Sequence, residues 1–348
     1  MRDSLPSGVL LLCVSLVGAC SSDGASPDAA ADQRPSDLPS ADLATDSAPP
    51  HPCGLTGTPP SGYTLGVPSF GKDELIVYVP GELPLIVATP HGGHKEGGLP
   101  VRDEAKAKAC PSGEGYNIKN DSNSQELARA IVDAVIARTG RRPHLVVNDL
   151  ARSRLDANRT LCVAATGEPR AEQAWREFHR FIDDAKAHVA ARCGRGLYLD
   201  IHTHGHDTVW AELGVLLPAT TLAEPDATLD GDATIAQASS LRGLAAASSE
   251  AFSTLLRGPQ SFGSLLVAAS GHAAVPSKEL PHPAGKAYFS GGYNTYRHGS
   301  REKGGAIDAI QIESRFSMFD EAKERAAYAD AIAQAALAFL EQHYGYSF

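Results

Sequence analysis

Short apolar runs alternate with longer amphipathic segments along residues 53–348. The apolar runs predict strands at 74–79, 83–90, 144–148, 196–202, 213–218 and 306–313, and we expect the first two to be neighbours. The amphipathic segments predict helices at 123–140, 168–192, 234–258 and 320–344. Strands that alternate with helices indicate βαβ units. The pattern therefore predicts one α/β domain over 53–348, a three-layer α/β/α fold with a mainly parallel mixed sheet.

Residues 1–52 lack this pattern. Residues 1–19 combine Arg2, an apolar stretch and small residues, which is typical of a secretory signal and too short for a spanning helix. Residues 17–20, VGAC, resemble the lipobox of bacterial lipoproteins. The resemblance implies cleavage before Cys20, a lipid on its sulfur and, with Ser21 next, anchoring in the outer membrane. A plain signal peptide or an N-terminal anchor is the alternative. Residues 20–52, rich in Ala, Ser, Asp and Pro, are expected to form a disordered tether.

Composition narrows the class of protein. The chain is 43% hydrophobic and 21% charged, which is ordinary for a globular protein. Its formal net charge of −10 argues against nucleic acid as a partner. No CxxC pair is present, which argues against a cysteine zinc site. The predicted domain holds four cysteines, which allow two disulfides in three pairings or else stay buried as free thiols: Cys53, Cys110, Cys162 and Cys193.

Polar residues gather where the predicted strands end. Ligands of parallel sheets bind beyond the carboxyl ends of the strands, so these positions are the place to look for a site. The first such stretch comes directly after 83–90 and reads HGGHKE. The others are DANR at 156–159, HTHGH at 202–206 and the glutamate that ends AIQIE at 313.

The histidines and carboxylates at these ends predict a metal site. Catalytic zinc takes three nitrogen or oxygen ligands and a water. His91 and Glu96 on one loop, with a histidine from 202–206, would supply such a set. Asp200 is expected to orient a neighbour rather than His202 itself. The alternative is ordinary loop histidines, or a surface cluster that chelates metal without function.

Glu313, Asn158 and Arg159 have functional and ordinary interpretations. A carboxylate beside a zinc-bound water takes its proton and passes it to a leaving nitrogen, which is one role for Glu313. A solvated glutamate is the other. The guanidinium of Arg159 has a fork that suits a carboxylate, but a loop arginine is also often solvated.

Taken in order, LDANR (155–159), LYLDIHTHGH (197–206) and AIQIE (309–313) resemble the hydrolases of the zinc carboxypeptidase, or phosphorylase/hydrolase-like, fold. PHGG (90–93) is similar to the N-formylglutamate amidohydrolase-like branch, and HGGHKEG (91–97) to the metal loop of phage poly-γ-glutamate hydrolases. The resemblance rests on these four motifs across most of 83–316. It implies one zinc ion per chain, with ligands His91, Glu96 and His202. It also implies that Glu313 is the general base and that Asn158 and Arg159 bind a carboxylate.

The resemblance leaves some positions open. The carboxypeptidases proper have H-x-x-E, which places His94 where their glutamate stands, so His94 is an alternative to Glu96. LPVRD (99–103) and DSNSQELA (121–128) look like further elements of the amidohydrolase-like branch. They suggest Arg102 for polarising the scissile carbonyl, a role that Arg152 or Arg154 could also fill. Tyr293, in the glycine-rich stretch 288–300, suits a substrate-binding loop or a surface turn.

These patterns predict a lipid-anchored zinc amidohydrolase. Its substrate would be an acylated amino acid, a γ-glutamyl chain or a peptide that carries a carboxylate. Because the protein is predicted to be exported, the favoured substrate is an extracellular or periplasmic peptide or polyglutamate. The alternative is a lipoprotein that binds metal or a carboxylated ligand without cleaving it, which would have no need of Glu313 as a base.

Overall fold

Four parallel strands form the centre of the fold. The structure is a computed structural model that describes residue 53, residues 59–301 and residues 305–348, so the predicted signal peptide, Cys20 and the whole of the predicted tether lie outside the described residues. The described strands form one sheet in the order β1-β2-β4-β3-β5-β8-β6-β7. They are β1 (Ser69–Phe70), β2 (Ile76–Val79), β3 (Leu85–Thr89), β4 (His144–Asn148), β5 (Gly196–His204), β6 (Ala211–Gly214), β7 (Ala274–Val275) and β8 (Ile307–Arg315).

The sheet is mixed, as predicted. Strands β4, β3, β5 and β8 are parallel neighbours, whereas β2 is antiparallel to β4 and β6 is antiparallel to β8. The helices are α1 (Glu104–Lys108), α2 (Ser124–Thr139), α3 (Leu161–Ala165), α4 (Pro169–Cys193), α5 (Ala219–Leu222), α6 (Asp226–Gly231), α7 (Ala233–Ala238), α8 (Arg242–Ala247), α9 (Phe252–Arg257), α10 (Phe262–Ser270), α11 (Tyr293–His298) and α12 (Ala322–Tyr344). Two 3₁₀ turns, Lys72–Glu74 and Phe316–Met318, complete the described elements.

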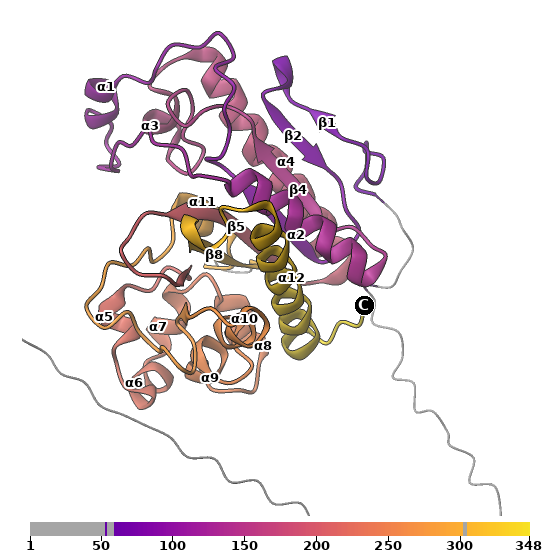
Figure 1. Cartoon of the computed structure of the whole chain (residues 1–348), viewed down its shortest axis with the longest axis vertical. Coiled ribbons are helices and arrows are strands. Elements are labelled where there is room, and N and C mark those ends of the chain that lie inside the picture. The colour runs from indigo at the N-terminus through magenta and orange to yellow at the C-terminus, as the bar shows by residue number, and fades with distance from the viewer. Residues whose placement is uncertain (1–52, 54–58, 302–304) are drawn as a thin grey trace, which may run out of the picture. The chain divides into compact units, whose positions relative to one another are not determined.

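Helices cover both faces of the sheet, which gives the three predicted layers. Helices α2 and α12 lie side by side on one face (Figure 1). The connections β3–α2–β4 and β4–α4–β5 run in opposite directions along the sheet, so right-handed crossovers place α4 on the other face. There, Phe181 of α4 stacks on Tyr78 of β2, and His298 of α11 lies against Tyr198 of β5.

Most predicted elements are confirmed, and the exceptions have local causes. The helix expected at 234–258 is three short helices, α7, α8 and α9. The Ser239 hydroxyl donates to the carbonyl of Val215 at 3.1 Å, and the Ser240 hydroxyl donates to that of Ala309 at 2.6 Å. Serine side chains that bond to backbone groups elsewhere in the fold compete with the helix, so α7 ends at Ala238, just before these two serines. The strand expected at 213–218 ends early because Leu216 has a left-handed φ of 68°.

The prediction that the first two strands are neighbours is wrong. Strand β4 lies between β2 and β3. The chain leaves β2 and crosses close to the start of β4, where a Cβ at Gly81 would lie 2.3 Å from the carbonyl carbon of Pro143. Glycine permits this close approach, and the crossing carries β3 to the far side of β4.

Two disulfides resolve the pairing that the sequence left open. Cys53 is bonded to Cys193, and Cys110 is bonded to Cys162. The second bond joins the segment after α1 to the start of α3. Among the described residues, no helix is both long and apolar enough to cross a membrane.

The two disulfides should differ in what their loss affects. Replacing either cysteine pair with alanine should lower the free energy of unfolding by about 2–5 kcal/mol, because each closes a long loop in the unfolded chain. Only Cys110→Ala, Cys162→Ala should also increase amide hydrogen exchange over residues 111–121. Denaturant unfolding and hydrogen exchange of the full chain measure both effects. The Cys53→Ala, Cys193→Ala variant is the matched control, and equal exchange in the two variants would contradict the expectation.

Candidate metal centre

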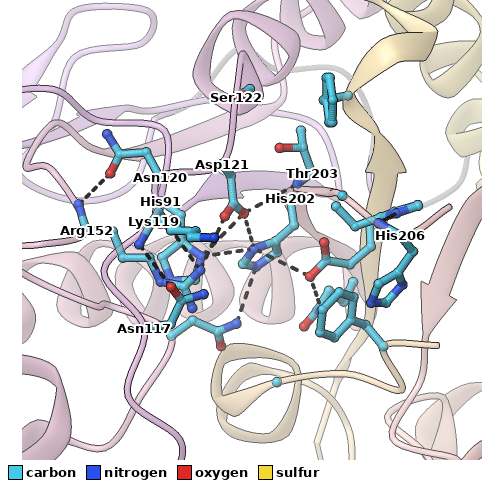
Figure 2. A pocket seen from close by; sticks show the side chains of 18 of the residues that line it. His91, Asn117, Lys119, Asn120, Asp121, Ser122, Arg152, His202, Thr203 and His206 are labelled. Carbon is cyan, nitrogen blue, oxygen red and sulfur yellow. Dashed lines mark hydrogen bonds and ion pairs between the residues drawn. The ribbon is translucent and has the colours of Figure 1, made fainter. Parts of the chain in front are cut away.

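The carboxyl ends of the parallel strands form the floor of a cavity of ≈ 400 Å³. His91 follows β3, Asp121 precedes α2, and His202 and Glu313 are cross-strand neighbours on β5 and β8. Asp156 follows β4. Figure 2 shows the side chains of His91, Asp121 and His202 pointing toward one another in this cavity.

Three ligand atoms meet at one point. The Nδ1 atoms of His91 and His202 are 3.2 Å apart. The Oδ2 atom of Asp121 lies 2.8 Å from the His202 nitrogen and 3.4 Å from the His91 nitrogen. With zinc–ligand bonds of about 2.0–2.1 Å, the edges of a tetrahedral zinc site are about 3.3 Å. The three side chains are buried and have the spacing of ligands around one small cation.

The other ring nitrogens fix which atoms face inward. His91 Nε2 lies 2.6 Å from Asp156, and His202 Nε2 lies 3.0 Å from Asp200. A carboxylate only accepts, so each Nε2 carries the proton and donates it. In that state both Nδ1 atoms present lone pairs to each other and to Asp121. Three acceptors without a donor between them form a site that favours a positive charge, and the carboxylate–histidine pairs are typical of metal ligands.

Asp200 corrects an expectation from the sequence. It contacts His202 directly rather than a neighbour, because residues two apart on a strand face the same side of the sheet. Tyr198 and Asn294 also donate to its Oδ1 atom, at 3.0 and 3.2 Å. The carboxylate is fully buried with three donors around it, which holds the ring of His202 in place.

The expected middle ligand, Glu96, does not reach this centre. After His91 the chain runs beside residues 149–151, with Lys95 N donating to Asp149 O at 2.8 Å. This path carries Glu96 to the surface, where it pairs with Arg154 at 2.9 Å and its side chain is 74% exposed. His94, the alternative, is also exposed and lies 3.4 Å from Asn120.

Asp121 provides the carboxylate that Glu96 was expected to provide. Burial alone would raise its pKa, but His91 and His202 lower the pKa well below the ordinary value, so the group is ionised. Asp121 lies thirty residues after His91 in the sequence, just before α2. An aspartate at such a position is usually interpreted as a residue that caps the start of the helix. Only one feature of the sequence pointed to Asp121: it belongs to the stretch 121–128, which resembles the amidohydrolase-like branch.

Glu313 lies beside the three ligands. Its Oε1 atom is 3.9 Å from His202 Nδ1 and accepts a hydrogen bond from Gln311 at 2.9 Å. Burial raises the pKa of Glu313 to about 8, and the charges of Asp121 and Glu212 act in the same direction. Such a carboxylate can exchange a proton near neutral pH when it is not compensated by a cation.

Arg152 and Arg102, which were both candidates for polarising the scissile carbonyl, differ in their position relative to the cavity. Arg152 lines the cavity and donates to Asp156 at 3.0 Å and to Asp121 at 3.4 Å. Arg102 is not among the residues that line it. Its guanidinium is buried against the backbone carbonyls of Arg152, Val163 and Asn117. The prediction that Arg102 contacts the scissile carbonyl is therefore not supported by its position, and its role is to hold these loops together.

Of the three predicted substrate-binding residues, two line the cavity. Asn158 is buried, with Nδ2 3.4 Å from His202 Nε2, and Arg159 is half-buried nearby. Tyr293 is not among the described residues that line the cavity. Its ring packs against Trp175 and His179, with centroids 6.0 and 5.6 Å away. The adjacent glycines Gly291 and Gly292 line the cavity instead.

A second group of His204, His206 and Glu212 lies in the same cavity region. Both ring nitrogens of His204 already have backbone partners. Its Nε2 donates to Trp210 O at 3.0 Å, and its Nδ1 accepts from His206 N at 3.2 Å. His204 thus fixes the turn at the end of β5, whereas His206 and Glu212 form a pair at 2.8 Å.

No family model matches the chain, and no curated protein matches it. Among solved structures, the chain is similar to a gene product of Agrobacterium tumefaciens, with 15% identity over 74% of this chain and 91% of that one. It is also similar to the N-formylglutamate amidohydrolase of Ralstonia eutropha JMP134, with 16% identity over 75% and 93%. Both TM-scores are 0.38, so the function of this chain has to follow from its own residues.

The centre predicts which carboxylate holds the metal. The full chain should bind about one zinc ion, and His91→Ala, His202→Ala should abolish this binding. Asp121→Asn should weaken zinc binding at least about tenfold, because it removes a charged ligand. Glu96→Gln should bind zinc as the wild type does. Metal analysis and competition with a chelator measure these affinities, and a loss of zinc in Glu96→Gln with none in Asp121→Asn would reverse the assignment.

Proposed function

We propose that this domain is a zinc-dependent amidohydrolase that cleaves an amide bond in a substrate with a carboxylate. The observation that carries the proposal is the convergence of the His91, His202 and Asp121 acceptor atoms beside Glu313. A zinc ion held by these three residues would polarise the amide carbonyl and make a water molecule more acidic. The other roles belong to side chains that line the cavity.

Glu313 is the general base. It is buried beside the ligands, and Gln311 holds its Oε1 atom in place. From there its carboxylate takes a proton from the attacking water and later gives it to the leaving nitrogen. A protein that only binds a ligand has no use for an uncompensated buried carboxylate at this position, so Glu313 favours catalysis over simple binding.

Arg152 and the pair Asn158 and Arg159 position the substrate. The Nε and Nη1 atoms of Arg152 are fixed by Asp156 and Asp121. Its guanidinium is thus held at the cavity wall, where it can stabilise the charge that develops on the carbonyl oxygen. Arg159 uses Nε and Nη1 for the carbonyls of Gly115 and Asn158, which orients its guanidinium for the substrate carboxylate.

Replacing Glu313 with glutamine should separate binding from chemistry. The Glu313→Gln variant should keep its zinc and bind N-acyl amino acids, while their hydrolysis falls at least about 100-fold because the proton acceptor is gone. Glu324→Gln, an exposed glutamate on α12, is the matched control.

A screen of N-acyl amino acids, γ-glutamyl peptides and ordinary peptides provides the substrate for this measurement. Unchanged turnover in Glu313→Gln would remove Glu313 from the mechanism. If the wild type binds such compounds tightly and hydrolyses none of them, the domain is a ligand-binding protein instead.

We also propose that the chain is a lipoprotein anchored in the outer membrane through Cys20. The support is the VGAC sequence after an apolar stretch, followed by Ser21 and a segment of small and polar residues. A lipid on Cys20 would hold the enzyme at the membrane while the segment 21–52 spans the distance to the domain.

Replacing Cys20 with alanine should release the protein from the membrane. In a Gram-negative host, the wild type should label with a radioactive fatty acid and sediment with outer-membrane vesicles. Cys20→Ala should do neither, because the acylated sulfur is absent. Cys13→Ala, a change of the same kind within the apolar stretch, is the control. Fatty-acid labelling that persists in Cys20→Ala would refute the assignment.

A further inference from the structure

We propose that the cavity wall opposite the arginines is a subsite for an aromatic group, so that the preferred substrate is an amino acid carrying an aromatic acyl group. This inference rests on the proposed amidohydrolase function. It specifies the part of the substrate that lies across the scissile bond from the carboxylate.

The cavity has two chemically different sides. One side is lined by cations and amides: Asn117, Lys119, Asn120, Arg152, Asn158 and Arg159. Figure 2 shows Asp121 and His202 between Arg152 and Lys119 on this side and His206 on the other. A substrate whose carboxylate lies on the first side, with its amide at the metal centre, extends its other end toward His206.

Aromatic rings form the second side. Phe289 and Phe316 line the cavity together with His206. The rings of His206 and Phe289 are stacked, with centroids 4.6 Å apart and an interplanar angle of 16°. Phe289 is 43% exposed, although it belongs to a cavity wall. An exposed aromatic surface inside a cavity is the kind of surface that binds an apolar, planar group.

Glu212 holds this surface in place. Its side chain is fully buried, and each of its oxygens accepts one hydrogen bond. His206 Nδ1 donates to Oε1 at 2.8 Å, and the backbone N–H of Phe289 donates to Oε2 at 2.7 Å. A single carboxylate therefore fixes both stacked residues, which come from segments about eighty residues apart. We name His206 and Phe289, so held, the aromatic platform.

Charge makes an acidic acyl group unfavourable here. Glu212 and Glu313 are cross-strand neighbours, and no lysine or arginine is among the described residues that line this side. Arg315 is nearby but lies over the ring of Phe316, 4.9 Å from its centroid, and does not line the cavity. A γ-glutamyl group would bring both a charged ammonium and a carboxylate against the rings and place that carboxylate toward two buried carboxylates, whereas a formyl group would leave the platform uncovered.

The test compares acyl groups on one amino acid. The full chain, purified in detergent and loaded with zinc, is given N-benzoyl-, N-formyl- and N-γ-glutamyl-glutamate. The benzoyl compound should have a kcat/KM at least about tenfold above the other two, because only it fills the apolar subsite. A γ-glutamyl or formyl compound that is cleaved as well as the benzoyl compound would overturn the proposal.

Binding to the Glu313→Gln variant separates this proposal from the proposed function. Calorimetry should show the benzoyl compound binding at least about tenfold more tightly than the formyl compound. This preference would support the subsite even if the wild type hydrolysed nothing, an outcome that would count against the amidohydrolase alone. Equal affinities would exclude the subsite whether or not the wild type is active.

Two variants test the residues of the platform. Phe289→Ala should reduce the preference for benzoyl over formyl about tenfold. Phe70→Ala removes another exposed phenylalanine, at the opposite edge of the sheet, and should leave the preference unchanged. Glu212→Gln should raise KM for the benzoyl compound more than it lowers kcat, because Glu212 acts by positioning. A preference unchanged by Phe289→Ala would overturn the proposal. The proposal would also be overturned if the wild type bound two zinc ions per chain and His206→Ala bound only one, because His206 would then be a metal ligand.

Discussion

The two hydrogen bonds from His91 to Asp156 and from His202 to Asp200 determine the chemistry of the cavity. Each fixes a proton on Nε2 and so turns a lone pair inward on Nδ1. The pairing of β3 with β5 then brings the two rings within reach of each other. Without the buried carboxylates, either imidazole could place its proton between the rings, and the three acceptor atoms would no longer face one another.

Those carboxylates impose an electrostatic constraint on the whole region. The buried acidic side chains here are Asp121, Asp156, Asp200, Glu212 and Glu313, and the buried guanidiniums are those of Arg102 and Arg152. Burying so much uncompensated negative charge is costly, and a divalent cation bound by His91, Asp121 and His202 would offset it. The pKa of His202 reflects the same field. Burial lowers it, but Asp200 and Glu313 raise it well above the ordinary value, so the centre attracts positive charge. A proton and a metal ion would compete for that position.

The sequence predicted the layers of the fold, all four central strands and two of the three residues at the candidate metal centre, because these depend on periodicity and on the residues at the end of each strand. His91 and His202 lie at such ends, so their meeting results from parallel pairing. The third residue of the candidate centre, Asp121, could not be found in this way. Glu96 is near His91 in sequence, but the backbone pairing of residues 92–95 with 149–151 carries it away. Asp121 is near His91 only because of tertiary folding, in which its own N–H donates to the carbonyl of His91. Spacing along a loop does not determine such a path.

The antiparallel edge of the sheet explains why the cavity extends beyond the metal centre. Residues two apart on a strand share a face, so Tyr198, Asp200 and His202 line up on β5, and Gln311 and Glu313 on β8. A parallel neighbour of β8 would need a crossover at this point. Instead β6 runs back beside β8 and sets Glu212 directly across from Glu313. That carboxylate then anchors His206 from the end of β5 and Phe289 from the segment before α11. The parallel strands thus position His91, His202 and Glu313 at the candidate metal centre, and Glu212 of the antiparallel strand anchors the aromatic wall.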